Sequence, residues 1–151
     1  MRIVLQNVKE SHLSIANRLF CSIGPGYVLL VGFCEGDDEH LAIKMAERIL
    51  KMRVFQDEKG KTNLSIVDVE GSILAVPQFT LYADLSGGRR PSFTKALEPR
   101  AAKGLFDTFV KALKDSYPDV GQGVFGADMQ VNLTNDGPFT LILDSRDLFP
   151  L

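Results

Sequence analysis

The sequence predicts an α/β fold, a curved mixed β-sheet or partial barrel of about eight strands flanked by two long helices. Three observations carry this prediction. Short strand-like runs alternate with turn signals over most of the chain, and only two segments show the wide apolar stripe of an amphipathic helix. The strands and helices also follow one another in mixed order, without internal repeats. We expect the 151 residues to form a single domain, 1–151, because this length is typical of one hydrophobic core.

The first third of the chain predicts three strands. In residues 2–8 and 13–20, apolar and polar side chains alternate as they do on the two faces of a β-strand. Residues 23–26, Ile-Gly-Pro-Gly, form a turn signal because proline restricts φ and the glycines accept unusual dihedral angles. The run 27–33 is almost wholly apolar, so we expect a central strand that is buried on both faces.

The first helix is predicted after Asp37-Asp38, because a carboxylate at the N-cap accepts free backbone N–H groups and suits the positive end of a helix. Its apolar stripe extends to about Met52. The next segment predicts strands and turns: a strand starting at Val54-Phe55, a hairpin-like turn at 57–61, a strand at 64–69 and a long strand at 72–82.

The second helix is predicted to begin at Pro99 and to end before Pro118, since proline is accepted in the first turn of a helix but not in its interior. The remaining chain predicts flexible linkage at 121–126 and two strands, 124–134 and 139–144, joined by a turn at Asn135-Asp136-Gly137-Pro138.

Charge narrows the classes of binding partner. The chain has a net charge of −2 and so lacks the surplus of basic residues that is typical of proteins that bind long duplexes. We therefore expect no DNA partner. A local basic group remains at Arg89, Arg90 and Lys95, beside a Gly-Gly turn. This group is compatible with a contact to the end of a tRNA and also with an ordinary solvated loop.

The apolar runs, the N-terminal residues and the cysteines of the sequence indicate in which cellular compartment the protein is expected. No apolar run approaches the roughly 20 residues of a membrane-spanning helix, so we expect no membrane association. Residues 1–10 lack the pattern of a signal peptide. Without an export signal, Cys21 and Cys34 are expected to be reduced thiols in a cytoplasmic protein. No cluster of cysteine and histidine suggests a metal site.

The segment Pro77-Gln78-Phe79-Thr80-Leu81 is the first candidate for chemistry. The chain has no nucleophile elbow, no P-loop and no histidine beside a nucleophile, so side-chain acid–base catalysis is not indicated. Main-chain N–H groups at the end of a strand can instead stabilise the oxyanion that forms when water attacks an ester. The Thr80 hydroxyl has no base in the motif, which favours a positioning role. The alternative is purely structural, with Phe79 in the core and Gln78 facing solvent.

The segment Asn135-Asp136-Gly137-Pro138 is the second candidate. As a plain turn, it uses the conformational freedom of Gly137. As a functional segment, a cis Gly-Pro bond would direct two carbonyl groups to the same side, where they could hold an ammonium group. The same rigid backbone would leave no room for the side chain of one enantiomer, so chirality would be read by exclusion.

Four motifs, taken together, resemble those of the D-aminoacyl-tRNA deacylase family. The resemblance runs from Ile3-Val4-Leu5-Gln6 almost to the C-terminus, and the order and spacing of the motifs make it specific. The motifs are Pro77-Gln78-Phe79-Thr80-Leu81, Arg90-Pro91-Ser92-Phe93, Ala127-Asp128-Met129-Gln130-Val131 and Asn135-Asp136-Gly137-Pro138-Phe139-Thr140.

The resemblance implies a homodimer of the family's fold that hydrolyses the ester between a D-amino acid and the 3′ end of tRNA, and that also clears glycine from mischarged tRNA. It implies that Gln78, Phe79 and Thr80 form the catalytic pocket. Gly137 and Pro138 would enter the partner's pocket and reject L-amino acids, with Asn135 and Met129 beside the substrate. A ribose hydroxyl of the tRNA is thought to assist, and no metal or cofactor is expected.

Two residues depart from the family pattern. Pro77 replaces a serine, and Asn7 replaces an arginine that helps to fix the Gly-Pro geometry. A related deacylase that removes L-alanine from mischarged tRNA has proline at the position of Pro77 and a trans Gly-Pro bond, whereas Phe79 favours the D-specific enzymes. The alternatives to a D-specific deacylase are therefore this L-alanine activity, a non-catalytic domain that binds the tRNA end, and a structural dimerisation protein.

Overall fold

The computed structural model describes residues 1–151 as one mixed sheet with a small separate hairpin. Six strands form the main sheet in the order β2-β1-β3-β6-β7, with β8 paired to β1, and β4 pairs only with β5. The elements are β1 (Arg2–Ile15), β2 (Arg18–Ile23), β3 (Gly26–Gly32), α1 (Glu39–Lys51), β4 (Arg53–Gln56), β5 (Thr62–Ser65), β6 (Ser72–Pro77), the 3₁₀ helix η1 (Phe79–Tyr82), α2 (Pro99–Ser116), β7 (Val120–Gln122), β8 (Met129–Asp144) and α3 (Ser145–Leu148).

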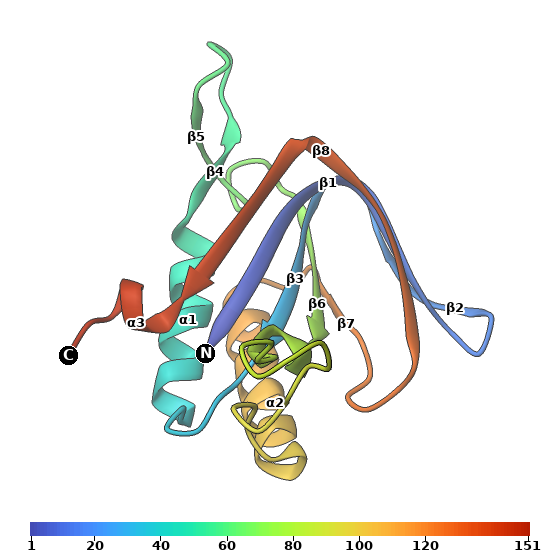
Figure 1. The fold of residues 1–151 in the computed structure, drawn as a ribbon. Coiled ribbons are helices and arrows are strands. Elements are labelled where there is room, and N and C mark those ends of the chain that lie inside the picture. Colours follow the sequence, from blue (N-terminus) through green and yellow to red (C-terminus); the bar gives the residue numbers. More distant parts are fainter.

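The sheet is curved, as expected from the mixed pattern of the sequence. β1 is antiparallel to β2, β3 and β8, whereas β3 and β6, and β6 and β7, run parallel. β1 and β8 bend together along their length (Figure 1). The predicted α/β class, with a mixed sheet and two long helices, is therefore confirmed.

The core lies mainly between the sheet and the two long helices. One cluster of 23 buried residues joins α1 and α2 to β1, β3 and β6. A smaller cluster that includes Val28 and Leu74 fills the other side of the sheet. Because Tyr27 and Leu29 belong to the first cluster and Val28 to the second, β3 is buried on both faces, as the apolar run predicted. None of the helices is long and apolar enough to cross a membrane.

Both long helices begin where the sequence predicted. The Asp38 carboxylate accepts a hydrogen bond from the Leu41 backbone N–H at 2.8 Å, which caps α1. Pro99 is the first residue of α2, and the Glu98 side chain accepts from the N–H groups of Arg100 and Ala101. The caps satisfy backbone donors that have no partner within the helix.

Several predicted strand boundaries are wrong. The predicted strand 13–20 is divided by a turn at Ala16-Asn17, whose φ values are positive (51° and 61°). The prediction missed this turn because the alternation of apolar and polar side chains continues through it. β5 covers Thr62–Ser65 and not 64–69, and β7 overlaps the predicted linkage 121–126. The short strand β7 takes its hydrogen bonds from the parallel neighbour β6, so no local pattern marks it.

The longest predicted strands also differ from those observed. The strand predicted at 72–82 ends at Pro77, and the chain continues through Gln78 into η1. In contrast, the strands predicted at 124–134 and 139–144 are one strand, β8, without a reversal at Asn135-Asp136-Gly137-Pro138. Both halves of β8 pair with β1, so the expected turn is a bulge in a continuous strand.

Candidate active site

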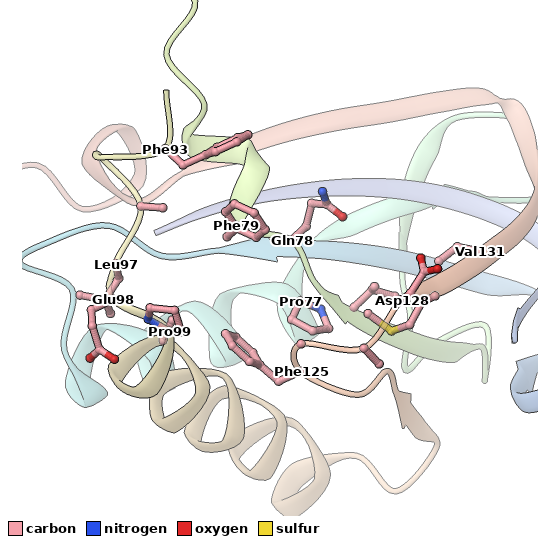
Figure 2. A pocket seen from close by; sticks show the side chains of 16 residues that line it. Pro77, Gln78, Phe79, Phe93, Leu97, Glu98, Pro99, Phe125, Asp128 and Val131 are labelled. Carbon is pink, nitrogen blue, oxygen red and sulfur yellow. The ribbon is translucent and has the colours of Figure 1, made fainter. Parts of the chain in front are cut away.

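A cavity of about 570 Å³ lies between the end of β6, the start of α2 and the start of β8. Figure 2 shows the side chains around it, with Phe79 and Phe93 on one side and Phe125 on another. The lining is Val76, Pro77, Gln78, Phe79, Phe93, Ala96, Leu97, Glu98, Pro99, Ala102, Phe125, Gly126, Ala127, Asp128, Met129 and Val131. Most of these side chains are apolar, which is typical of a site for a small organic group.

The cavity brings together three of the four sequence motifs. Gln78 and Phe79 come from the first motif, Phe93 from the second, and Met129 from the third. Thr80, although it is adjacent to Phe79, does not line the cavity. The segments that the sequence separates by tens of residues therefore form one wall, which periodicity alone does not predict.

The motif around Gln78 lies at the cavity wall and contains main-chain N–H groups without a hydrogen-bond partner. The Gln78 N–H donates to the Val31 carbonyl at 2.7 Å and is unavailable to a ligand. Phe79 and Thr80 are the first two residues of η1, so their N–H groups have no partner within that helix. The Gln78 side-chain amide contacts the Thr80 hydroxyl, which ties the hydroxyl within the motif. The Phe79 ring meets that of Phe93 edge to face, at 5.0 Å between centroids.

The sequence motifs missed the far wall of the cavity. Leu97, Pro99 and Phe125 supply its apolar surface, and they come from the start of α2 and from the loop before β8. Two carboxylates, Glu98 and Asp128, also face it. The Glu98 carboxylate caps α2, so only Asp128 has no hydrogen bond to the protein. The proline that starts α2 was a signal for the helix but not for the cavity.

Gly137 and Pro138 lie outside this cavity, on an exposed part of β8. The bond between them is cis, and Gly137 has a φ of +136°. Between the pairs Val8–Asn135 and Gln6–Thr140, Asn7 alone stands opposite residues 136–139 of β8, so the segment is a bulge.

The side chain of Asn135 holds the two ends of the bulge together. Its Oδ1 accepts from the Phe139 N–H at 2.6 Å, and its Nδ2 donates to the Thr140 hydroxyl at 2.8 Å. Asn7, in contrast, donates to the Val54 carbonyl at 2.7 Å, and its buried Oδ1 has no partner. In this chain, Asn135 and not Asn7 therefore makes the side-chain contacts to the bulge.

The basic group predicted at Arg89, Arg90 and Lys95 lies outside the cavity, on an exposed loop. Lys95 is not free, because its Nζ lies 3.0 Å from the Asp84 carboxylate. Hydrogen bonds from Ser86, and then from Lys95, hold the pKa of Asp84 well below its usual range. Arg89 and Arg90 are in no ion pair, so two of the three predicted cations are unengaged.

The fold and the cavity define a class of protein. It is an α/β protein with a largely apolar cavity at the end of a strand, and neither His12 nor His40 lines the cavity wall. No group of three or more histidine, cysteine, aspartate or glutamate side chains is placed to hold a metal ion. Cys21 and Cys34 are not bridged.

Comparison with known proteins identifies the family. The model of the D-Tyr-tRNA(Tyr) deacylase family matches residues 4–144. A D-aminoacyl-tRNA deacylase of Lactobacillus acidophilus is 49% identical over 144 residues, which cover 95% of this chain and 99% of the relative. One of Thermomicrobium roseum is 49% identical over 148 residues, with 98% and 96% covered. The chain belongs to the D-Tyr-tRNA(Tyr) deacylase family, whose members are hydrolases.

Two solved structures share the fold. A structure of the c-Myc DNA unwinding element binding protein superposes with a TM-score of 0.90 and 35% identity, covering 95% of this chain and 98% of the other. A probable eukaryotic D-amino acid tRNA deacylase gives a TM-score of 0.80 with 20% identity, covering 94% and 97%. The predicted family and fold class are thereby confirmed.

Proposed function

We propose that this chain hydrolyses the ester bond of D-aminoacyl-tRNA and, as the family resemblance implies, of mischarged glycyl-tRNA, releasing free tRNA and the amino acid. One observation carries the proposal: the cavity is assembled from the motifs that relate the chain to the deacylases, with Gln78, Phe79 and Met129 in its wall. The aminoacyl group and the terminal adenosine would occupy this cavity. Its apolar walls suit a base and a side chain.

In the proposed mechanism, the main chain stabilises the oxyanion that forms during hydrolysis. Water attacks the ester carbonyl carbon, and the negative charge develops on the carbonyl oxygen. The N–H group of Phe79 is the donor for this oxyanion, since the N–H of Gln78 is already bonded and Thr80 does not line the cavity. The C–O bond to the ribose then breaks, and the ribose oxygen takes up the proton that the attacking water loses. A ribose hydroxyl of the tRNA assists the attack, so no side-chain base is required.

We further propose that Gly137 and Pro138 exclude L-amino acids from the cavity of a partner subunit. Both residues are exposed and lie away from the cavity of their own chain, which supports a role in another copy. β8 pairs only with β1, so its second edge is free for such an approach. The Asn135 side chain holds this segment through its hydrogen bond from the Phe139 N–H. Met129 lies in the cavity wall that would receive the substrate.

The activity is proposed for the cytoplasm, where Cys21 and Cys34 would stay reduced. The partner is the 3′ end of aminoacyl-tRNA, held with the help of Arg89, Arg90 and Lys95. No DNA partner is proposed for this chain, because its net charge is −2. No metal or cofactor takes part in the proposed reaction.

The purified protein is expected to deacylate D-Tyr-tRNA rapidly and to leave L-Tyr-tRNA intact, with a chelator present. The physical reason is that a backbone segment against the Cα atom leaves no room for an L side chain. The measurement is loss of labelled amino acid from each tRNA. Equal rates on D-Tyr-tRNA and L-Ala-tRNA would contradict strict chirality and favour the L-alanine alternative. Binding without hydrolysis would identify a tRNA-end binding domain instead.

The protein is expected to be a homodimer in solution, with a mass twice the 16.7 kDa of the chain. The reason is that the proposed selection uses Gly137 and Pro138 of one subunit in the cavity of the other. Light scattering coupled to gel filtration measures the mass directly. A monomer that still rejects L-Tyr-tRNA would refute the exchange of these residues between subunits.

A further inference from the structure

We infer that Arg2 is a positioning residue for ester hydrolysis, which it serves by fixing η1 against the end of β8. The inference rests on the proposed function, because η1 carries Phe79 to the wall of the cavity. Arg2 does not line that cavity, so its proposed effect on the reaction acts through the segment that it holds.

The guanidinium of Arg2 connects two separate parts of the chain. Its Nη1 donates to the Leu81 carbonyl at 2.8 Å, while its Nε and Nη2 donate to one oxygen of Asp144 at 3.2 and 3.1 Å. The guanidinium carbon also lies 4.8 Å from the centroid of the Tyr82 ring, within the range of a cation–π contact. One side chain thus contacts the main chain and a ring of η1, and it is itself held by a carboxylate.

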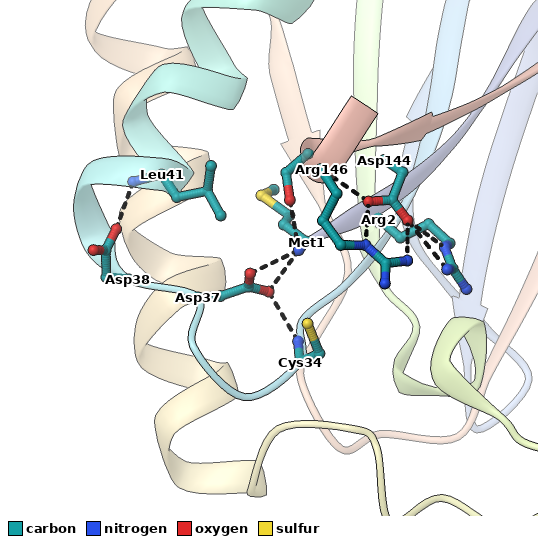
Figure 3. A network of polar contacts seen from close by, with 9 residues as sticks. Met1, Arg2, Cys34, Asp37, Asp38, Leu41, Asp144 and Arg146 are labelled. Carbon is teal, nitrogen blue, oxygen red and sulfur yellow. Dashed lines mark hydrogen bonds and ion pairs between the residues drawn. The ribbon is translucent and has the colours of Figure 1, made fainter. Parts of the chain in front are cut away.

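The carboxylate at the other end of this connection is firmly placed. Asp144 is only 7% exposed, and its second oxygen accepts from the Arg146 backbone N–H at 3.0 Å. The guanidinium of Arg146, and then that of Arg2, hold the pKa of Asp144 well below its usual range, so the carboxylate stays charged. Figure 3 shows both guanidinium groups converging on Asp144.

The residues next to Arg2 and Asp144 in the chain are held by further polar contacts. The buried α-amine of Met1 donates to Asp37 at 2.7 Å and to the Ser145 hydroxyl at 3.1 Å. The chain neighbours of Arg2 and Asp144 are therefore fixed to each other, and the start of β1 cannot move without breaking an ion pair. Figure 3 shows the contact of the Met1 α-amine with Asp37. The backbone next to Arg2 is consequently held in place.

Few other hydrogen bonds orient η1. The Leu81 N–H reaches the Gln78 carbonyl at a long 3.4 Å, and no side chain other than Arg2 hydrogen-bonds to the main chain of η1. The Tyr82 hydroxyl is buried without a hydrogen-bond partner, so this side chain is held by packing and by its cation–π contact with Arg2. Losing the bond from Arg2 would leave η1 free to tilt, and a displacement of about 1 Å near reacting atoms can cost about a hundredfold in rate.

The test compares Arg2→Met, Arg2→Lys and the control Arg146→Met on D-Tyr-tRNA. Arg146 pairs with the same carboxylate, with its Nη2 at 2.8 Å, but its side chain makes no hydrogen bond to η1. We expect Arg2→Met to lower kcat by about a hundredfold with KM unchanged, since only the reacting geometry is disturbed. Arg146→Met should keep the wild-type kcat. Arg2→Lys, which keeps one charged donor, should recover part of the loss.

Three outcomes would overturn the inference: an unchanged kcat in Arg2→Met, an equal loss in Arg146→Met, or a loss that appears in KM alone. Hydrogen exchange of the amides in residues 81–83 gives a second readout that does not use the substrate, and it should accelerate in Arg2→Met but not in Arg146→Met. If the wild-type protein fails to hydrolyse any D-aminoacyl-tRNA, the proposed function fails. Unaltered exchange in Arg2→Met instead refutes the positioning role.

Discussion

Replacing Phe79 by proline is expected to lower the kcat for D-Tyr-tRNA about a hundredfold below that of Phe79→Ala. The alanine variant loses the ring but keeps the main-chain N–H, whereas the proline variant loses both. Their ratio therefore isolates the contribution of the N–H group, and removing one donor from an oxyanion site typically costs 10²–10³ in kcat, as an order-of-magnitude estimate.

Proline suits this position better than others in the motif. Phe79 is the first residue of η1, where the restricted φ of proline is compatible with a helix and the N–H has no partner within the helix. The preceding Gln78 has a φ of −146° and a ψ of 84°, so it is not helical. The ring is 53% exposed, and both variants should therefore fold.

Single-turnover measurements with saturating enzyme separate the chemical step from substrate binding. Thr80→Ala serves as the companion control, because it removes only a hydroxyl that lies outside the cavity lining and should retain most of the activity. Equal rates for Phe79→Pro and Phe79→Ala would falsify the main-chain mechanism at this residue. A complete loss in Thr80→Ala would instead return the hydroxyl to the role of nucleophile.

Replacing Gly26 by alanine is expected to destabilise the fold by more than about 3 kcal/mol, beyond the usual cost of overpacking. A Cβ atom at this position would lie 1.8 Å from the Ser72 carbonyl oxygen and 2.6 Å from the Ser72 nitrogen. These are backbone atoms of β6, which pairs with β3 in parallel, so no flexible side chain can move aside. The two central strands would have to separate.

Gly24→Ala is the matched control for this prediction. It lies two residues before Gly26, in the connection between β2 and β3, and a Cβ there has no neighbour within 4 Å, so we expect a change within about 0.5 kcal/mol. Unfolding in urea, followed by circular dichroism, gives both free energies of unfolding. Similar midpoints for the two variants would contradict the close approach of β3 and β6.

The two long helices and the central strand were predicted correctly from the sequence. The apolar stripes, Asp38 as the cap of α1 and Pro99 at the start of α2 all lie where they were predicted, because periodicity and capping depend on neighbours within one turn. The burial of β3 on both faces was equally predictable from its continuous apolar run. The family was evident from the order of four short motifs.

The errors have a common cause. The strand predicted at 72–82 stops at Pro77, and the expected turn at Gly137 and Pro138 is a bulge within β8. In both cases the local residues signal an irregular backbone but do not say which direction the chain takes. That direction depends on the partner strand, since β1 is long enough to pair with β8 on both sides of the bulge.

The fold class, both long helices, the central strand and the family of this protein could be predicted from the sequence, because these follow from local periodicity and from motif order. The folded chain was needed to see which main-chain donors remain free, where Gly137 and Pro138 lie relative to the cavity, and that Arg2 holds Leu81. These features join residues far apart in the chain, such as Arg2 and Leu81. Local patterns carry no information about such contacts, which form only when the sheet and the helices pack together.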